Sequence, residues 1–446
     1  MRKHLFKNSF LLCALFVSAL SLLLAACSSA PARPPLNTKG SPTPVLTALD
    51  PAATICPRFG TARAAVMPSL RMGEQPELIY YSGDSQGDSF LQRINVATNA
   101  TTEMLGLANA HITEAQVSAD GQWLLFVIVI NYPHQHIELR MVRVDGQYQQ
   151  TLFCLPAATT PYASELGQFV WSPDLASVAV QGFSGPFDLP AIYLVDLKHG
   201  HVQLEIASSF SQLQQGPTGP HPLQTEIYTP LKWLDNTRLY VGGYQSSGSV
   251  LSQANTYLLD TTRGANQTNA DLQTVLSNTH VFSGPSVCDF DSSQDATRLY
   301  VAQCSYKNNV VQKQSSITVQ PTTGGPAKTI YSTNAFAIIG VRVIDSHTLL
   351  LLTGKSIGNG YSGDTLWKIN IDGTGLTQLA SGNALTWCSY LQNNCSNVST
   401  NGRLFAYMAS GGSSDLLYYG SLAGGKPRQV AQLNSLYEAI VGWTTM

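Results

Sequence analysis

Apolar and polar residues alternate with a period of two along most of the chain beyond residue 77. In "LWKINID", for example, Trp367, Ile369 and Ile371 share one face, and polar residues stand between them. A β-strand places successive side chains on opposite faces, so this alternation predicts strands. Apart from the first residues of the chain, no segment shows sustained helical periodicity. The pattern therefore predicts an all-β protein.

The strands are grouped into hairpins of a recurring form. Each hairpin of the first type has an apolar strand, a turn rich in Asp, Ser, Asn or Gly, and a second strand rich in β-branched and aromatic residues. "FVWSPDLASVAV" at 169–180 is one of them. The set covers 114–127, 169–180, 230–242, 287–302, 340–352 and 395–408.

Hairpins of a second type alternate with the first and outnumber them by one. They cover 90–105, 138–153, 192–206, 256–276, 316–331, 365–379 and 416–430. The missing partner lies at the two ends of the repeat region, where 77–82 is a lone second strand and 439–446 a lone first strand. Joined, these two strands complete a seventh hairpin and close a ring.

This arithmetic predicts a seven-bladed β-propeller with four strands in each blade and one blade split between the two ends of the chain. The repeat length is about 53 residues, within the range of blade-type repeats. We assign the propeller domain to residues 77–446.

Two of the turns carry a recognisable motif. "SADGQWLLFV" and "WSPDLASVAV" resemble the TolB-like, WD-like propeller repeat, in which Trp-Ser-Pro-Asp-Gly precedes an apolar strand. Leu175 stands where that motif has Gly. The resemblance implies the propeller fold. It does not imply TolB's additional α/β domain, because residues 28–76 are too short and too rich in proline to form one.

The N-terminus has the layout of a secretion signal. Arg2, Lys3 and Lys7 precede an apolar run at 9–24, and Leu-Ala-Ala-Cys follows at 24–27. This ending resembles the lipobox of bacterial lipoproteins, which implies cleavage before Cys27 and lipidation of its thiol. The alternative is an ordinary secretory signal with a chance cysteine. We expect a signal peptide at 1–26, a lipidated, proline-rich tether at 27–76, and an extracytoplasmic, lipid-anchored protein of the bacterial cell envelope.

Six cysteines remain after the signal and Cys27, and an even number outside the cytoplasm indicates disulfides. Cys388 and Cys395 lie in one loop, and Cys288 and Cys304 flank one predicted hairpin. Cys56 and Cys154 are left to pair with each other, which would fasten the end of the tether to the propeller.

Composition argues against nucleic acid as a ligand. Only 12% of the residues are charged, the net charge is −2, and no basic run follows the first seven residues. Such a surface is polar but weakly charged. We expect no cofactor and a monomeric protein.

The chain offers little to support catalysis or metal binding. No G-x-S-x-G elbow is present, and "GYSGD" at 360–364 only approaches one. "DFDSSQD" at 289–295 resembles a calcium loop but lacks its Gly, which favours a structural turn. "YPHQHIE" places His134, His136 and Glu138 at alternate positions, and without a further ligand a polar loop is favoured over a metal site.

The turns within the first-type hairpins, which we call the Asp-type turns, should lie on one rim of the propeller. The long loops on the opposite rim are the predicted ligand face. They include 131–136, 159–167, 182–190, 207–228, 244–255, 277–284, 355–363 and 386–396. Exposed aromatic residues with polar neighbours suit sugars, peptides or protein surfaces. The candidates are Tyr132, Tyr162, Phe187, Tyr244, Phe282, Tyr361, Trp387 and Tyr390. Packing of these rings within the loops themselves is the alternative.

The sequence therefore favours a membrane-anchored binding or interaction module whose ligand is a peptide, a glycan or a partner protein. Two alternatives stay open. One is a propeller enzyme with a site in the central channel, such as a glycan lyase or hydrolase, which needs carboxylates that converge on one point. The other is a structural subunit of an envelope assembly, which needs an exposed apolar patch on one rim.

Overall fold

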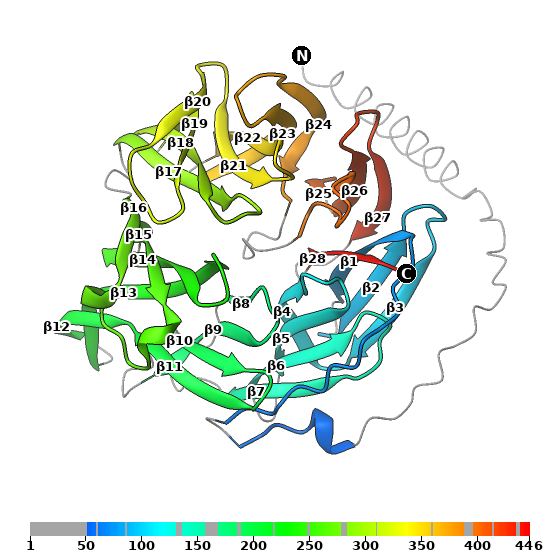
Figure 1. Ribbon diagram of the computed structural model, residues 1–446, viewed down its shortest axis with the longest axis vertical. Coiled ribbons are helices and arrows are strands. Elements are labelled where there is room, and N and C mark those ends of the chain that lie inside the picture. Colours follow the sequence, from blue (N-terminus) through cyan, green and yellow to red (C-terminus); the bar gives the residue numbers. More distant parts are fainter. Residues whose placement is uncertain are drawn as a thin grey trace, which may run out of the picture. The chain divides into compact units, whose positions relative to one another are not determined.

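The alternating segments form strands that pair into seven antiparallel sheets. The computed structural model describes residues 51–58, 61–84, 87–130, 136–156, 168–184, 189–216, 219–247, 250–277, 283–308, 310–357, 360–387, 396–412, 414–433 and 438–446. All of them belong to one unit, Ala48–Met446. Figure 1 shows the sheets arranged in a ring, with β4, β8 and β28 near its centre and β3, β7 and β11 at its periphery. We number the sheets as blades 1 to 7 in chain order.

The first four blades include the split blade, blade 1, and the five-stranded blade 4. Blade 1 contains β28 (Ala439–Thr445), β1 (Pro76–Gly83), β2 (Ser89–Asn95) and β3 (Thr101–Leu107). Blade 2 contains β4 (Ala110–Val117), β5 (Trp123–Ile130), β6 (His136–Arg143) and β7 (Gln150–Pro156). Blade 3 contains β8 (Phe169–Trp171), β9 (Ser177–Ser184), β10 (Leu189–Asp196) and β11 (His201–Ala207). Blade 4 contains β12 (Ser209–Gly216), β13 (Gly219–Trp233), β14 (Arg238–Ser247), β15 (Val250–Asp260) and β16 (Gln273–Ser277).

The last three blades complete the ring. Blade 5 contains β17 (Ser283–Ser292), β18 (Arg298–Lys307), β19 (Val310–Pro321) and β20 (Lys328–Thr333). Blade 6 contains β21 (Ala337–Val343), β22 (Thr348–Ile357), β23 (Gly360–Asn370) and β24 (Thr377–Leu385). Blade 7 contains β25 (Leu404–Ser410), β26 (Asp415–Ser421) and β27 (Arg428–Leu433), and a Val398–Phe405 bridge stands where its inner strand would pair.

The described helical segments are short 3-10 turns. They are η1 (Pro51–Thr54), η2 (Thr261–Arg263) and η3 (Asn269–Asp271). Within the described residues, no helix is long and apolar enough to cross a membrane.

The ring closes as the sequence predicts, through the two ends of the repeat region. β28 pairs antiparallel with β1, in a register that sets Trp443 opposite Leu78. The last strand of the chain thus becomes the inner strand of the blade whose other strands come first. The seven-bladed fold with a split closing blade is confirmed.

Three of the predicted loops are wrong, because strands run through them. The segment 207–228 forms the hairpin of β12 with the first half of β13, in which Ser209 pairs with Glu226 and Gly216 with Gly219. The segments 244–255 and 355–363 extend β14 into β15 and β22 into β23. In each case the segment predicted as a loop is an antiparallel extension of paired strands.

Four of the turns within the first-type hairpins share one hydrogen-bond pattern. In the turn after β8, Ser172 Oγ donates to Asp174 Oδ1 at 2.6 Å, and the same Oδ1 accepts from Ala176 N at 3.1 Å. Leu175 adopts a φ of 59° there. Ser118–Gly121, Ser293–Ala296 and Ser399–Gly402 repeat the pattern, each with positive φ at the last residue. The motif is thus a structural turn.

Apolar clusters fill the spaces between neighbouring blades. Trp171, for instance, packs against a cluster that combines Trp123 of blade 2 with Val178 of blade 3. A hydrogen bond also crosses every one of the seven blade boundaries. The donors and acceptors are Thr444 Oγ1 and Gly121 O, Phe169 N and Glu114 Oε2, Trp233 Nε1 and Val170 O, Tyr240 Oη and Thr322 O, Val341 N and Asp289 Oδ2, Lys368 Nζ and Leu422 O, and Tyr419 Oη and Val96 O.

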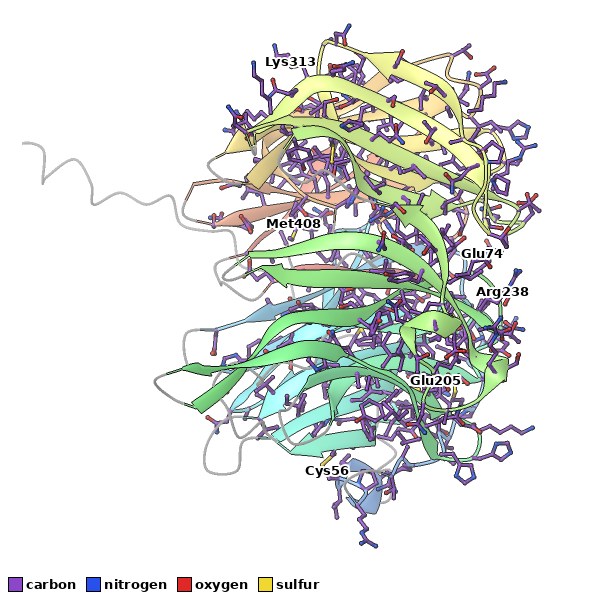
Figure 2. The ribbon with its side chains drawn as sticks, turned by 90° about the vertical axis from the view of Figure 1, so that its left-hand side faces the viewer. Cys56, Glu74, Glu205, Arg238, Lys313 and Met408 are labelled. Carbon is purple, nitrogen blue, oxygen red and sulfur yellow. A yellow bond between two sulfur atoms is a disulfide. The ribbon has the colours of Figure 1, made fainter. Side chains whose placement is uncertain are left out.

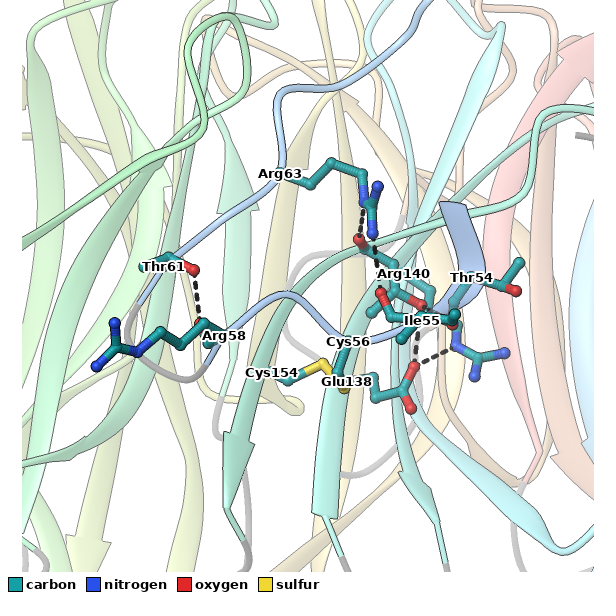
Figure 3. Close-up of a disulfide and its surroundings, with 10 residues drawn as sticks. Thr54, Ile55, Cys56, Arg58, Thr61, Arg63, Glu138, Arg140 and Cys154 are labelled. Carbon is teal, nitrogen blue, oxygen red and sulfur yellow. Dashed lines mark hydrogen bonds and ion pairs between the residues drawn. A yellow bond between two sulfur atoms is a disulfide. The ribbon is translucent and has the colours of Figure 1, made fainter. Parts of the chain in front are cut away.

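The segment before β1, residues 51–75, lies against the propeller, and we call it the strap. It begins at the outer edge of blade 2, where a disulfide joins Cys56 to Cys154 of β7. Figure 3 shows the surroundings of this disulfide, with Arg63 donating from Nη2 to Ile55 O at 3.0 Å and from Nε to Thr151 O at 3.2 Å. Arg63 N also donates to Leu152 O at 2.8 Å, so the strap pairs with the outermost strand of the blade.

Beyond Arg63 the strap crosses the rim that carries the short turns. Ala65 N donates to Leu197 O at 2.7 Å, and Leu70 N donates to the Gln122 side chain at 2.6 Å. Figure 2 shows Glu74 of the strap on the same side of the propeller as Arg238, which follows the turn between β13 and β14. The strap therefore covers part of the short-turn rim.

Candidate functional site

A groove between blades 6 and 7 is the candidate site. It has a volume of about 550 Å³ and lies between β24, the outermost strand of blade 6, and the face of blade 7 formed by β25 and β26. Its lining residues are Gln378, Leu379, Ala380, Ser381, Gly382, Asn383, Tyr407, Ala409, Ser410, Leu416, Tyr418, Gly425, Lys426 and Pro427. This size is within the range of ligand pockets.

One wall of the groove is formed by β24. Residues 378–383 line it without a gap. Leu379 and Ala380 of this run are buried against blade 7, whereas the other four residues are exposed. β24 pairs with β23 on its other side and ends its sheet. Its sequence, TQLASGNAL, has no charge and no proline. The strand therefore presents backbone groups that are available for pairing.

The other wall is an aromatic ladder on blade 7. Tyr407 and Tyr418 are directly opposite each other on β25 and β26, and their rings stack with centroids 5.1 Å apart and an angle of 8° between planes. Phe405 also stacks with Tyr407, with ring centroids 6.0 Å apart. The ladder gives the groove a rigid apolar wall.

Tyr407 also contributes a hydroxyl without a protein partner. The residue is 4% exposed, and among the described residues nothing forms a hydrogen bond with its Oη. Burial, together with the neighbouring Tyr418, raises the pKa of Tyr407 to about 12. The phenol therefore stays neutral at physiological pH and can donate a hydrogen bond to a ligand. Tyr418 differs, because its hydroxyl already contacts Gln429 Oε1 at 3.4 Å.

A single charged side chain, that of Lys426, belongs to the lining. Lys426 is exposed in the turn between β26 and β27. The remaining polar lining comes from the uncharged side chains of Gln378, Ser381, Asn383 and Ser410. The groove is thus suited to a ligand that is mostly neutral and has one negative group.

Sequence reasoning did not single out this groove. A signal for the ladder is present, because "LFAYMAS" and "DLLYYGS" form a hairpin in which Tyr407 and Tyr418 are in register. The uncharged sequence of β24 is a second signal, since outermost strands commonly carry charges or proline. What the sequence does not show is that the groove between blades 6 and 7 stays open.

The inner strands carry a second polar cluster, which links three blades. Lys232 of β13 pairs with Asp291 of β17, and Arg342 of β21 pairs with Asp289 of β17. Val341 N donates to Asp289 Oδ2 at 3.0 Å, and Val343 N donates to Asp291 Oδ2 at 2.8 Å. Burial raises the pKa of Asp289, although the Arg342 guanidinium opposes the shift. Each carboxylate is thus already held by a cation and a backbone amide, an arrangement that joins blades.

The same contacts explain the acidic run at 289–295. Its carboxylates diverge, because Asp295 lies in the turn, where it accepts from Ser293 Oγ at 2.6 Å, while Asp289 and Asp291 contact blade 6. They do not form a common oxygen cage of the kind that calcium requires.

Glu114 of β4 is a further carboxylate on the inner strands. It is 5% exposed, and burial raises its pKa to about 8, while hydrogen bonds from Gln116 and Phe169 N act in the opposite direction. Its Oε2 accepts from Phe169 N at 3.2 Å across the boundary between blades 2 and 3. Glu114 therefore also serves the packing of neighbouring blades.

Trp387 is the one predicted ligand-face aromatic whose side chain the structure describes, and it is 5% exposed. Arg342 lies over its ring at 5.0 Å, and a Cβ at Gly340 would come within 2.3 Å of Trp387. The ring fills space between blades instead of presenting an open face. Tyr132, Tyr162, Phe282 and Tyr390 lie outside the described residues, as do Phe187 and the side chains of Tyr244 and Tyr361.

Two of the predicted cysteine pairs are joined, Cys56–Cys154 and Cys288–Cys304. Cys388 and Cys395 lie outside the described residues. Glu138 brings a carboxylate to within 4.8 Å of Cys56 and Cys154, but both sulfurs are bonded to each other. Glu138 accepts from Arg140 at 2.7 Å and from Thr151 at 3.0 Å, which fixes it as part of the joint between strap and blade. His134 and the side chain of His136 lie outside the described residues.

Comparison with known proteins extends this description to the class of protein. No known protein family and no curated protein matches the sequence. Solved structures do match, at low sequence identity. The sheet topology itself defines the chain as a seven-bladed β-propeller.

Three solved structures illustrate the similarity. A prolyl endopeptidase matches with a TM-score of 0.50 and 13% identity, over 85% of this chain and 51% of that chain. An uncharacterised protein from Listeria monocytogenes matches with a TM-score of 0.44 and 14% identity, over 84% and 96% of the two chains. A putative TolB from Agrobacterium tumefaciens matches with a TM-score of 0.38 and 15% identity, over 70% and 92%. Similarity at this level shows the fold alone.

Proposed function

We propose that this protein is a lipid-anchored binding module of the bacterial cell envelope. Cys27 carries the lipid, residues 28–50 span the distance from the bilayer, and the propeller binds a ligand. The interblade groove is the observation that supports the binding role, because it combines an apolar wall, an unpaired strand edge and the free Tyr407 hydroxyl. Ligand sites in proteins typically have this combination of apolar surface and a few placed polar groups.

Anchoring is supported from both ends of the tether. The lipobox-like sequence Leu-Ala-Ala-Cys supplies the lipid attachment, and the strap supplies the attachment to the propeller. The Cys56–Cys154 disulfide, the Arg63 hydrogen bonds and the contacts of Ala65 and Leu70 fix the strap at the edge of blade 2 and across the short-turn rim. Because the strap is fixed to the propeller, the lipid anchor would hold the propeller near the membrane by this side.

The anchor is tested by membrane fractionation of cells that produce the Cys27→Ala protein. We expect the wild type in the membrane fraction and the variant in the soluble fraction, since the variant cannot carry the acyl chains that stabilise membrane attachment. Cys288→Ala is the matched control, because it removes a cysteine far from the signal and should leave the protein on the membrane. Persistence of the Cys27→Ala protein on membranes would overturn the anchor.

The binding role is tested with the full-length protein in detergent against panels of peptides and neutral oligosaccharides, with binding and turnover measured in the same samples. Saturable binding without turnover is the expected result. Hydrolysis or elimination at enzyme-like rates would show a catalytic propeller instead.

A further inference from the structure

We infer that the groove between blades 6 and 7 takes an extended peptide of a partner protein, which adds as a strand to the free edge of β24 and carries a carboxylate near Lys426. The inference rests on the proposed binding role but not on the lipid anchor.

The geometry of the groove selects an extended chain. Residues 378–383 of β24 line it, and β24 is the outermost strand of its sheet, so a ligand in the groove can reach backbone groups that β24 leaves unpaired. Ala380, Ser381 and Gly382 have little or no side chain and allow another backbone to approach closely. Peptides that add to a sheet edge obtain affinity from such main-chain hydrogen bonds.

The protein already uses this mode of contact within its own chain. The outermost strand of blade 2, β7, is paired with the strap through Arg63 N and Leu152 O at 2.8 Å and through a bridge between Ala62 and Phe153. β24 holds the corresponding outermost position in blade 6, and none of the described segments pairs with its free edge. The free edge of β24 is thus available to an external segment.

Tyr407 and Lys426 define which peptides fit. Tyr407 lines the groove with a side chain that is 4% exposed, and its hydroxyl, which has no hydrogen-bond partner among the described residues, can bond to a carbonyl or a polar side chain of the ligand. The wall formed by Tyr407, Tyr418 and Leu416 accepts an apolar side chain. Lys426 is the one charged lining residue, so a carboxylate, from an acidic residue or the C-terminus of the peptide, complements the groove.

The test begins with selection of peptides on the full-length protein from a random octapeptide library with free C-termini. Selected peptides are measured by titration against the wild type, Tyr407→Phe, Lys426→Glu and the control Lys313→Glu, which changes an exposed lysine of β19 in blade 5. We expect affinity about three- to ten-fold weaker for Tyr407→Phe, since one hydrogen bond is lost. For Lys426→Glu we expect a loss of similar size that shrinks as salt is raised. Lys313→Glu should bind as the wild type does.

Strand addition has a signature that other binding modes lack. Methylation of the peptide backbone at successive nitrogens should weaken binding at every second position, because alternate amides face the partner strand. Hydrogen exchange of residues 377–385 should slow when the peptide binds. Both variants should retain the unfolding midpoint of the wild type, since Tyr407→Phe keeps the stacked ring and Lys426 is exposed.

The possible outcomes distinguish failure of the groove proposal from failure of the proposed binding role. Selected peptides that bind all four proteins equally, or whose methylation scan shows no alternation, would overturn the groove proposal and leave the binding role in place. Groove-dependent binding of neutral oligosaccharides, without any selected peptide, would overturn strand addition. Absence of any bound peptide or oligosaccharide would overturn both the groove proposal and the binding role.

Discussion

Gln150 holds the backbone of Val66 with both ends of its side-chain amide. Oε1 accepts from Val66 N, and Nε2 donates to Val66 O, each at 2.9 Å. Gln150 is the first residue of β7 and is 1% exposed, so water cannot replace these bonds. The pair reproduces with one side chain the contact that a neighbouring strand would make, and it fixes the middle of the strap to blade 2.

Replacement of Gln150 by Leu should lower the free energy of unfolding by about 1–3 kcal/mol, because both backbone groups of Val66 lose their partner. Chemical denaturation measures the change. Gln312→Leu is the control, since the amide of Gln312 contacts only Val310 O of its own strand and its loss should cost less than about 0.5 kcal/mol. Equal stability of the two variants would show that the strap contributes little to the folded state.

The Cys56–Cys154 disulfide should stabilise the same strap through the unfolded state. It links residues separated by 98 positions, and removal of a native disulfide typically costs about 2–5 kcal/mol. We expect the double variant Cys56→Ala, Cys154→Ala to unfold at lower denaturant concentration and to be cleaved faster within the strap by a protease. The Cys288–Cys304 disulfide closes a shorter loop, with a sequence separation of 16. Its removal in the Cys288→Ala, Cys304→Ala variant should lower the free energy of unfolding less, with no faster cleavage of the strap. Slower or unchanged cleavage after loss of Cys56 and Cys154 would contradict this role.

Leu175 and Gly121 occupy the same position in matching turns of neighbouring blades, with φ angles of 59° and 72°. A residue with a Cβ pays about 1–2 kcal/mol for this conformation, whereas Gly does not. We therefore expect Leu175→Gly to raise the free energy of unfolding by roughly 1 kcal/mol after the larger chain entropy of Gly is deducted, and Gly121→Ala to lower it by a similar amount. Thermal unfolding of the two single variants checks both signs, and a stabilised Gly121→Ala protein would disprove the argument.

The turns also show why the fold was predictable from the sequence. Ser172, Asp174 and Leu175 set their turn through local hydrogen bonds, so the same spacing recurs wherever the turn recurs, and counting the recurrences gives the blades. The two lone strands at the ends of the repeat predict the pairing of β28 with β1 for the same reason. The repeat is thus visible in local sequence patterns, and the number of repeats predicts the fold.

The candidate site was not predictable in this way, because it depends on how far neighbouring blades stand apart. Tyr407 and Trp387 are both aromatic residues of the boundary between blades 6 and 7, and both are nearly buried. Trp387 is covered by Arg342, while Tyr407 lines a groove. No local pattern separates the two, since the difference comes from neighbours that are distant in the sequence, such as Arg342 over Trp387.

Glu114 should make the stability of the propeller depend on pH. Burial raises the pKa of this carboxyl from 4.5 to about 8 in the folded protein. The folded state therefore binds more protons than the unfolded state between these values, and the free energy of unfolding falls as pH rises through this window. Below about pH 4.5 the group is protonated in both states and the full contribution is present, whereas above pH 8 it has been lost.

Glu114→Gln should remove this dependence, because the amide stays neutral and can still accept from Phe169 N. We expect the wild type to lose more unfolding free energy than the variant between pH 5 and pH 9. Denaturant titration of both proteins at both pH values measures this. Glu103→Gln, on the exposed part of β3, is the matched control and should show no such change. A difference that is constant with pH, or that moves in favour of the wild type as pH rises, would show that the buried carboxyl between blades 2 and 3 is already ionised at pH 5.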